Sequence, residues 1–154
     1  MLKISKMADY AVVILSALAS ERQSRTAGQI ATETSLPEPT ASKILKILVR
    51  ENLVSSTRGI SGGYKLAKPM DVVTMKDIIT AIDGPINITS CVDEKNEGCN
   101  ILENCSVRGR WTSINGAIQD LLHEITLEDM LVSSGVNCCG VSLPKPKENA
   151  HGGH

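Results

Sequence analysis

Residues 52–67 read N-L-V-S-S-T-R-G-I-S-G-G-Y-K-L-A, and this stretch decides how the first half of the chain is organised. Residues typical of β-strands stand on both sides of a segment rich in glycine, which is the pattern of a β-hairpin with a tight turn. Gly59, Gly62 and Gly63 let the backbone turn sharply and approach phosphate groups without a Cβ atom between them. The hairpin is therefore expected to present Arg58 near its tip.

Two helices are expected directly before this hairpin. The segments T-A-G-Q (26–29) and S-L-P-E (35–38) both match the capping box, in which a hydroxyl and a side chain three residues later bond to each other's backbone. They predict helices at roughly 27–34 and 36–51, separated by a very short turn. Upstream, A-V-V-I-L-S-A-L-A (11–19) is apolar nearly all round, which predicts a helix buried by the elements around it.

The helix expected at 36–51 has an apolar face and a basic face. The residues of its inward stripe are Ile44, Leu45, Ile47 and Leu48. The basic residues on the opposite face, at spacings of three and four, are Lys43, Lys46 and Arg50. A short helix, a tight turn and a longer helix with a basic outer face describe a helix-turn-helix, and the hairpin after it is then the wing of a winged helix. The alternative is a solvated charged face on an ordinary helical hairpin.

We expect this unit to bind double-stranded DNA. The longer helix would enter the major groove while the hairpin tip carries Arg58 toward the adjacent minor groove. Charge agrees with this, since residues 1–68 contain ten Lys/Arg and five Asp/Glu, whereas residues 69–154 contain six and twelve. A basic half joined to an acidic half favours a polyanionic partner for one half only. The predicted DNA-binding residues are Thr40, Ser42, Lys43, Lys46, Arg50 and Arg58.

The second half contains shorter helical patterns. T-M-K-D (74–77) is expected to open a helix that ends at Gly84, and T-L-E-D (126–129) to cap a last short helix. Between them lies a heptad seam with spacings of four, three, four and three, suited to pairing with a second copy of the chain. The alternative is a stripe that packs on its own domain. The seam residues are Val107, Trp111, Ile114, Ile118 and Leu121.

Three of the five cysteines, Cys91, Cys99 and Cys105, lie in one polar segment, C-V-D-E-K-N-E-G-C-N-I-L-E-N-C (91–105, the cysteine segment). Such a segment cannot form an apolar core, so burial does not explain the thiols. Structural zinc prefers a close C-x₂₋₄-C pair and four ligands, and redox motifs use C-x-x-C. Neither spacing is present, because seven and five residues separate the cysteines. Wide spacing favours an iron–sulfur cluster, with zinc and thiol sensing left open.

The chain is thus expected to be mainly α, a winged helix-turn-helix with a small β-hairpin wing plus a long dimerisation helix. The expected parts are a DNA-binding domain at 1–84, a cysteine-rich cluster-binding loop at 85–106, the dimerisation helix and a short C-terminal helix at 107–136, and a flexible tail at 137–154. The sequence shows no signal-peptide pattern and no apolar run of about eighteen residues, so a cytoplasmic protein without a membrane partner is expected. Thiols stay reduced there, which disfavours disulfides. No enzymatic site or small-molecule substrate is expected.

Several motifs resemble the IscR/NsrR family of winged-helix iron–sulfur transcriptional regulators over roughly residues 1–132. They are R-G-x-x-G-G-Y-x-L-A from Arg58 to Ala67, K-x-x-D-Y-A from Lys6 to Ala11, and three cysteines before the expected dimer helix. Finer features are most similar to the proteobacterial regulators of the SUF iron–sulfur cluster assembly system. These features are L-P-E-P-T (36–40), G-P-I (84–86), C-V-D-E (91–94) and C-S-V-R-G-R-W (105–111).

The resemblance implies a homodimer that binds an operator and represses SUF genes. It also implies that the cluster reports iron–sulfur supply or oxidative stress and changes the affinity for DNA. Cys91, Cys99 and Cys105 would be cluster ligands. In the IscR branch a histidine three residues after the third cysteine completes the ligands, but Arg108 stands there and cannot ligate. The NsrR branch is similar at Asp9, which makes Asp9 a candidate fourth ligand from the partner subunit, although an acid near a helix start also complements the helix dipole.

We favour a [2Fe–2S] cluster over a [4Fe–4S] cluster. Two other interpretations stay open beside the cluster-sensing regulator. One is a zinc- or thiol-based winged-helix redox regulator. The other, from a different class, is an iron–sulfur cluster carrier or redox protein, which would contain a cluster but bind no operator.

Overall fold

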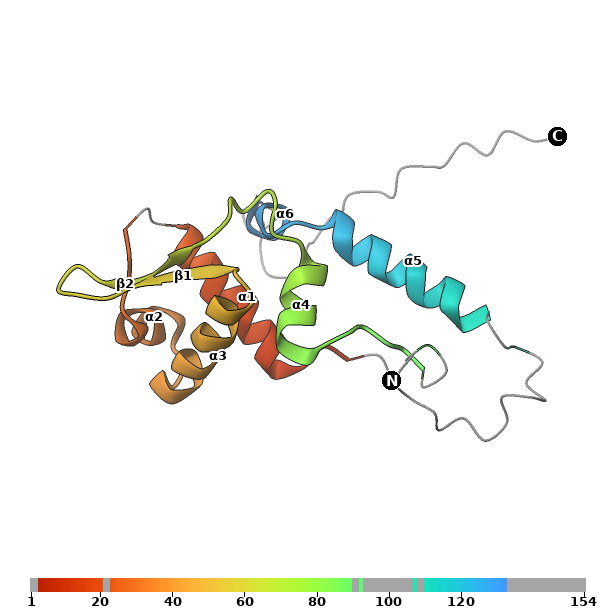
Figure 1. Cartoon of the computed structure of the whole chain (residues 1–154), viewed down its shortest axis with the longest axis horizontal. Coiled ribbons are helices and arrows are strands. Elements are labelled where there is room, and N and C mark those ends of the chain that lie inside the picture. The colour runs from red at the N-terminus through yellow and green to blue at the C-terminus, as the bar shows by residue number, and fades with distance from the viewer. Residues whose placement is uncertain (1–2, 21–22, 90–91, 93–106, 108–109, 133–154) are drawn as a thin grey trace.

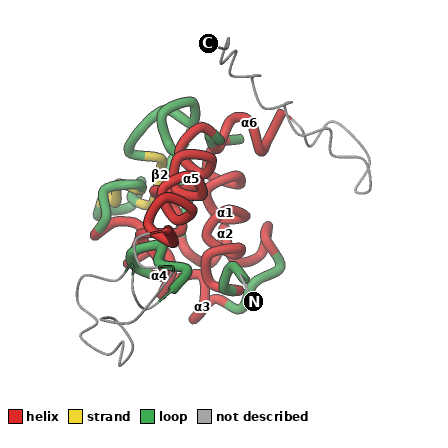
Figure 2. Tube along the Cα trace, turned by 90° about the vertical axis from the view of Figure 1, so that its right-hand side faces the viewer, coloured by secondary structure: helices red, strands yellow, loops and turns green. Residues whose placement is uncertain are grey.

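A computed structural model describes residues 3–20, 23–89, 92, 107 and 110–132. Within these residues the fold is mainly α with one antiparallel hairpin, as expected (Figure 1). The helices are α1 (Lys6–Ala19), α2 (Ala27–Thr34), α3 (Glu38–Arg50), α4 (Met75–Asp83), α5 (Arg110–Glu124) and α6 (Leu127–Val132). The strands are β1 (Val54–Thr57) and β2 (Gly63–Leu66). In Figure 2 both strands lie at one edge of a body made of helices.

Helix α1 is the centre of the fold, as its apolar sequence predicts. It packs against α2, α3, α4, α6 and β2. Ser5 starts the helix, because its Oγ accepts a hydrogen bond from the Ala8 N–H at 3.1 Å. The residues that α1 buries are Ala8, Ala11, Ile14, Leu15, Ala17 and Leu18. A helix covered on this many sides gives the neighbouring elements a fixed platform.

The helix-turn-helix forms with one capping box where the sequence predicts two. Thr26 and Gln29 cap α2 reciprocally, as predicted. The prediction for Ser35 is wrong: it ends α2 in the left-handed conformation, with φ 55°, and does not cap α3. The turn is too short for Ser35 to serve both helices. Helix α3 instead has Pro37 as its N-cap residue and spans 38–50 rather than 36–51. Pro39 lies in its first turn, where proline is well tolerated.

The hairpin is joined to the helical body as well as to itself. Strands β1 and β2 pair in the register Val54↔Leu66 to Thr57↔Gly63. On the other side of β2, Arg25 and Tyr64 exchange two backbone hydrogen bonds of 3.0 and 2.7 Å. The end of β2 nearest the turn is therefore held against the segment between α1 and α2, and the tip projects beyond it (Figure 1).

The chain returns to the first core after α5. Helix α4 begins after Thr74 and ends at Gly84, as predicted, and Thr74 and Asp77 form a capping box at its start. The Met75 N–H donates to the Ile125 carbonyl and the Leu127 N–H to the Val73 carbonyl, both at 2.8 Å. Leu127 is fully buried in the same core as α1 and α3. Helix α6 thus completes the core, a role that the sequence analysis did not foresee.

Candidate DNA-binding surface and cysteine segment

The basic face of α3 points outward because its apolar face is buried in the core. The core-facing residues, all fully buried, are Ala41, Ile44, Leu45 and Leu48. Lys43, Lys46 and Arg50 are exposed, while Thr40 and Ser42 are partly exposed. The predicted inward stripe is confirmed except that Ile47 is only half-buried. Packing therefore fixes both the position and the rotation of the helix that carries five predicted DNA-binding residues.

Arg50 has a partner that the sequence analysis missed. Its Nε lies 2.9 Å from the Oε1 atom of Glu51, and both side chains are exposed. An ion pair of this kind contributes at most about 1 kcal/mol in water. A phosphate group can therefore compete with Glu51 for the guanidinium at little cost.

The tip of the hairpin is a turn that only glycine can close. The Gly62 N–H donates to the Gly59 carbonyl at 2.9 Å. Gly59 has φ +115°, and a Cβ atom on Gly62 would lie 2.4 Å from the Thr57 carbonyl oxygen. Arg58, just before this turn, is exposed. Figure 1 shows the hairpin extending past the helices at the end of the molecule where α2 and α3 lie.

Arg25 connects α1, α2 and the start of β2. Its guanidinium forms a salt bridge with Glu33 of α2 and donates to the Ala17 carbonyl of α1 at 3.4 Å. Its backbone pairs with Tyr64 of β2. The side chain of Arg25 is only 11% exposed. In the sequence, an arginine between two predicted helices looks like an ordinary surface charge. No pattern in the sequence indicates that Arg25 joins three elements.

Asp9 lies in the first turn of α1, and its side chain is exposed. Within the part of the chain that the structure describes, its carboxylate has no hydrogen bond or salt bridge. The start of α1 lies beside the end of α4, because the Ser5 hydroxyl donates to Asp83 Oδ1 at 2.6 Å. The chain runs from there toward the cysteine segment. Cys91, Cys99 and Cys105 themselves lie outside the described residues.

Side chains of α5 form hydrogen bonds with the backbone of residues 86–88, which precede the cysteine segment. Asn115 is 3% exposed, and its Oδ1 accepts from the Ile88 N–H at 3.1 Å. One turn further, Gln119 Nε2 donates to the Ile86 carbonyl at 3.0 Å. Residues 86–88 are not in a helix or strand, so the Asn115 and Gln119 side chains bond backbone groups that regular secondary structure would otherwise pair. The sequence offered one signal for this, a pair of amides four residues apart on a helix with an apolar stripe.

The other face of α5 carries the seam. Helix α5 begins at Arg110, three residues later than the seam itself, so Val107 lies in a turn before it. Ile118 is half-buried. The remaining seam residues are exposed: Val107, Trp111, Ile114 and Leu121. Packing within the described chain therefore leaves most of the seam uncovered.

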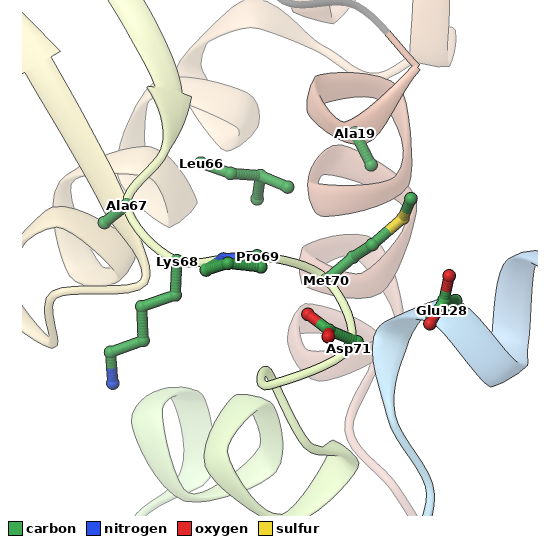
Figure 3. Close-up of a pocket in the computed structure, with 8 residues that line it drawn as sticks. All are labelled: Ala19, Leu66, Ala67, Lys68, Pro69, Met70, Asp71 and Glu128. Carbon is green, nitrogen blue, oxygen red and sulfur yellow. The ribbon is translucent and has the colours of Figure 1, made fainter.

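A hollow of about 470 Å³ lies apart from the predicted site residues that the structure describes. It lies between the end of α1, the residues after β2 and the start of α6 (Figure 3). None of the predicted site residues that the structure describes lines it. Among the described residues, no three His, Cys, Asp or Glu side chains are grouped to hold a metal ion. No described helix is long and apolar enough to cross a membrane.

Comparison with known proteins identifies the family. A model of Rrf2, described as an iron-dependent transcriptional regulator, matches residues 4–133. The chain belongs to the Rrf2 family. Within the Rrf2 proteins, it is 31% identical to a putative rrf2-like HTH-type transcriptional regulator of Rhodobacter capsulatus, over 84% of this chain and 93% of that protein.

Two further relatives extend the comparison. The HTH-type transcriptional regulator IscR of Erwinia tasmaniensis is 36% identical over 84 residues, which cover 54% of this chain but only 50% of that protein. The solved structure of CymR, the global cysteine regulator of B. subtilis, has a TM-score of 0.66 and 31% identity, over 89% of this chain and 100% of that one. The Rrf2 assignment confirms the expected winged-helix fold class and makes the chain a DNA-binding transcriptional regulator rather than an enzyme.

Proposed function

We propose that this Rrf2 protein is a homodimeric repressor of iron–sulfur cluster assembly (SUF) genes, and that its operator affinity depends on an iron–sulfur cluster. The observation that carries the proposal is the presence of Cys91, Cys99 and Cys105 in one short polar segment of a chain from an iron-dependent regulator family. The choice of SUF genes rests on the finer sequence motifs alone.

DNA recognition is assigned to α3 and to the wing. Thr40, Ser42 and Lys43 lie early on α3, where side chains of a recognition helix reach base edges. Lys46 and Arg50 lie later and are assigned to phosphates, which position a protein without reading sequence. Arg58, exposed beside the hairpin turn, is assigned to the minor groove.

A two-fold operator requires a two-fold protein, and the seam supplies the surface for it. Trp111, Ile114 and Leu121 are exposed along one side of α5, which supports a helix-to-helix contact with a second copy. Asn115 and Gln119 tie that same helix to residues 86–88. A conformational change in the cysteine segment that displaces residues 86–88 would therefore act on α5 through these two hydrogen bonds.

The proposed cofactor ligands are Cys91, Cys99 and Cys105, with Asp9 of the partner subunit as the fourth. An exposed carboxylate without a partner in the described chain suits this role. A bound cluster supplies a redox- and iron-sensitive link between these ligands, and we favour the [2Fe–2S] form. An oxygen ligand binds iron less tightly than thiolate does, which suits a sensor that must release its cofactor.

The test is anaerobic purification followed by visible absorption, iron and sulfide analysis. Wild-type protein should show sulfur-to-iron charge-transfer bands, and each of Cys91→Ala, Cys99→Ala and Cys105→Ala should lose them. Cys138→Ala, outside the cysteine segment, is the matched control and should keep them. With a duplex selected from a random library by the wild-type protein, operator affinity should differ between holo and apo forms by about 1–3 kcal/mol.

Each alternative has its own outcome in this experiment. Stoichiometric zinc without charge-transfer bands would replace the cluster by a zinc site, and neither metal nor bands would favour a thiol sensor. Equal operator affinity of the holo and apo forms would remove the sensing function. A cluster with no binding to any selected duplex would favour a carrier or redox protein.

A further inference from the structure

The hairpin tip carries an apolar side chain that the DNA-binding assignment above leaves unused. Ile60 has a relative exposure of 110%, so the whole side chain stands in solvent. A single exposed isoleucine is common on protein surfaces. Ile60 differs in its place, because it occupies the outermost turn of the wing and is two residues from Arg58.

The turn around Ile60 is fixed by its backbone. The hydrogen bond from the Gly62 N–H to the Gly59 carbonyl makes Ile60 and Ser61 the two central residues of a tight turn. Gly59 has a backbone conformation that favours glycine, and Gly62 has no room for a Cβ atom. The chain thus uses glycine on both sides of Ile60 and places its one large apolar group at the point of the turn.

The wing is also anchored close to its turn, where β2 begins. A Cβ atom on Gly63 would lie 2.7 Å from the Arg25 carbonyl oxygen, so β2 approaches the residue 25 backbone closely. Two backbone hydrogen bonds between Arg25 and Tyr64 hold that approach. The tip is therefore presented in a defined direction without ordering a flexible loop, which lowers the cost of placing it in a groove.

We propose that Ile60 is a wedge that enters the minor groove beside Arg58 and partly unstacks one base step. Minor-groove proteins use apolar side chains in this way, and the energy needed depends on how easily the step deforms. Ile60 thereby makes the wing a reader of DNA flexibility, with a preference for pyrimidine–purine steps. The inference rests on the proposed assignment of the wing to the minor groove.

The experiment compares wild type, Ile60→Ser and the neighbouring control Ser61→Ala on the duplex selected by the wild-type protein. In a second duplex, the pyrimidine–purine step nearest the wing is replaced by A-tract sequence. We expect Ile60→Ser to lower affinity for the first duplex about tenfold, as for a lost specific contact. Step replacement should weaken wild type and Ser61→Ala but not Ile60→Ser. The fluorescence of 2-aminopurine at that step should rise on binding of wild type and Ser61→Ala but not on binding of Ile60→Ser.

The outcomes separate this inference from the function on which it rests. Because Ile60 is fully exposed, its substitution should leave the melting temperature unchanged, so an affinity loss cannot come from unfolding. If step replacement weakens wild type and Ile60→Ser equally, or 2-aminopurine stays quenched with wild type, Ile60 is not a wedge. If wild type selects no duplex at all, the proposed assignment of α3 and the wing to DNA recognition fails first.

Discussion

Lys43 and Arg50 project from the same exposed face of α3 but lie seven residues apart, about 10 Å along the helix axis. That separation assigns them different contacts on DNA. Replacing Lys43 with Ala should weaken binding to the selected duplex by about 1–3 kcal/mol and change the preferred base. Arg50→Ala should weaken selected and random duplexes alike and lower the slope of the salt dependence by about one. Fluorescence anisotropy over a series of salt concentrations measures both quantities.

Glu51 provides the matched control for Arg50. Glu51→Gln removes the carboxylate that pairs with the Arg50 guanidinium, so it should strengthen binding to both duplexes slightly. If Lys43→Ala and Arg50→Ala had the same effect on both duplexes, the division between base and phosphate contacts would be wrong. No change for Glu51→Gln would show that the ion pair does not compete with DNA.

Asp129 makes the stability of the fold depend on pH in the acid range. Its pKa is lowered chiefly by the hydrogen bond from the Thr126 N–H, then by the Thr126 hydroxyl, and only burial opposes the shift. A carboxyl with a lowered folded pKa stabilises above its unfolded pKa of about 3.9 and loses that effect as pH falls through the folded value. The stability difference between wild type and Asp129→Asn should thus exist at pH 7 and shrink toward zero below about pH 4. Urea unfolding at several pH values measures this, and a difference that grows in acid would contradict it.

Helix α6 has only six residues and cannot be stable alone, so its docking on the first core is what forms it. Leu127 is fully buried there, whereas Val132 at the other end is 74% exposed. Leu127→Ala should lower the free energy of unfolding by about 2–5 kcal/mol through lost packing and a cavity. Val132→Ala is the control and should change it by less than about 0.5 kcal/mol. Urea denaturation measures both; equal values would mean that α6 is not part of the cooperative core.

Sequence patterns predicted the elements that form through local rules. The predicted elements include the apolar run of α1, the Thr26 capping box, the helix start at Thr74 and the glycine turn at 59–62. Each depends on a few neighbouring residues, and the structure confirms them. Ser35 failed because two helix ends compete for one residue. A match to the capping box carries no information about which helix the residue will serve.

Long-range contacts were outside the reach of such patterns. The pairing of Arg25 with β2, the docking of Leu127 in the first core and the amides of α5 on residues 86–88 all join parts of the chain that a linear pattern does not relate. Of the site residues, those on α3 could be assigned to a face because the helical period fixes it. The ion pair of Arg50 with Glu51 could not be predicted, because in the sequence Glu51 looks like one more exposed charge.

At the scale of the whole molecule, α5 has one face in the protomer and another that the described chain leaves open. Asn115 and Gln119 bind the backbone of residues 86–88. Ile114, by contrast, is exposed on the seam side. In the proposed dimer, α5 would transmit a change at residues 86–88 to the second copy. If the proposed dimer and sensor functions hold, this link would alter the spacing of two DNA-binding units without any change inside either one.

The seam provides a sharp test of this arrangement. Ile114→Glu and Ser113→Glu each place one new carboxylate on an exposed position of α5, but only Ile114 lies on the seam. In a dimer, Ile114→Glu would bury an unpaired charge, which costs several kcal/mol. We therefore expect sedimentation velocity to show a monomer for Ile114→Glu and a dimer for both wild type and Ser113→Glu. The melting of the protomer core should be preserved in both variants, because neither side chain is buried within the chain. Affinity for a palindromic duplex should collapse for Ile114→Glu while affinity for a single half-site stays close to that of wild type. A dimeric Ile114→Glu protein would place the two-fold contact elsewhere.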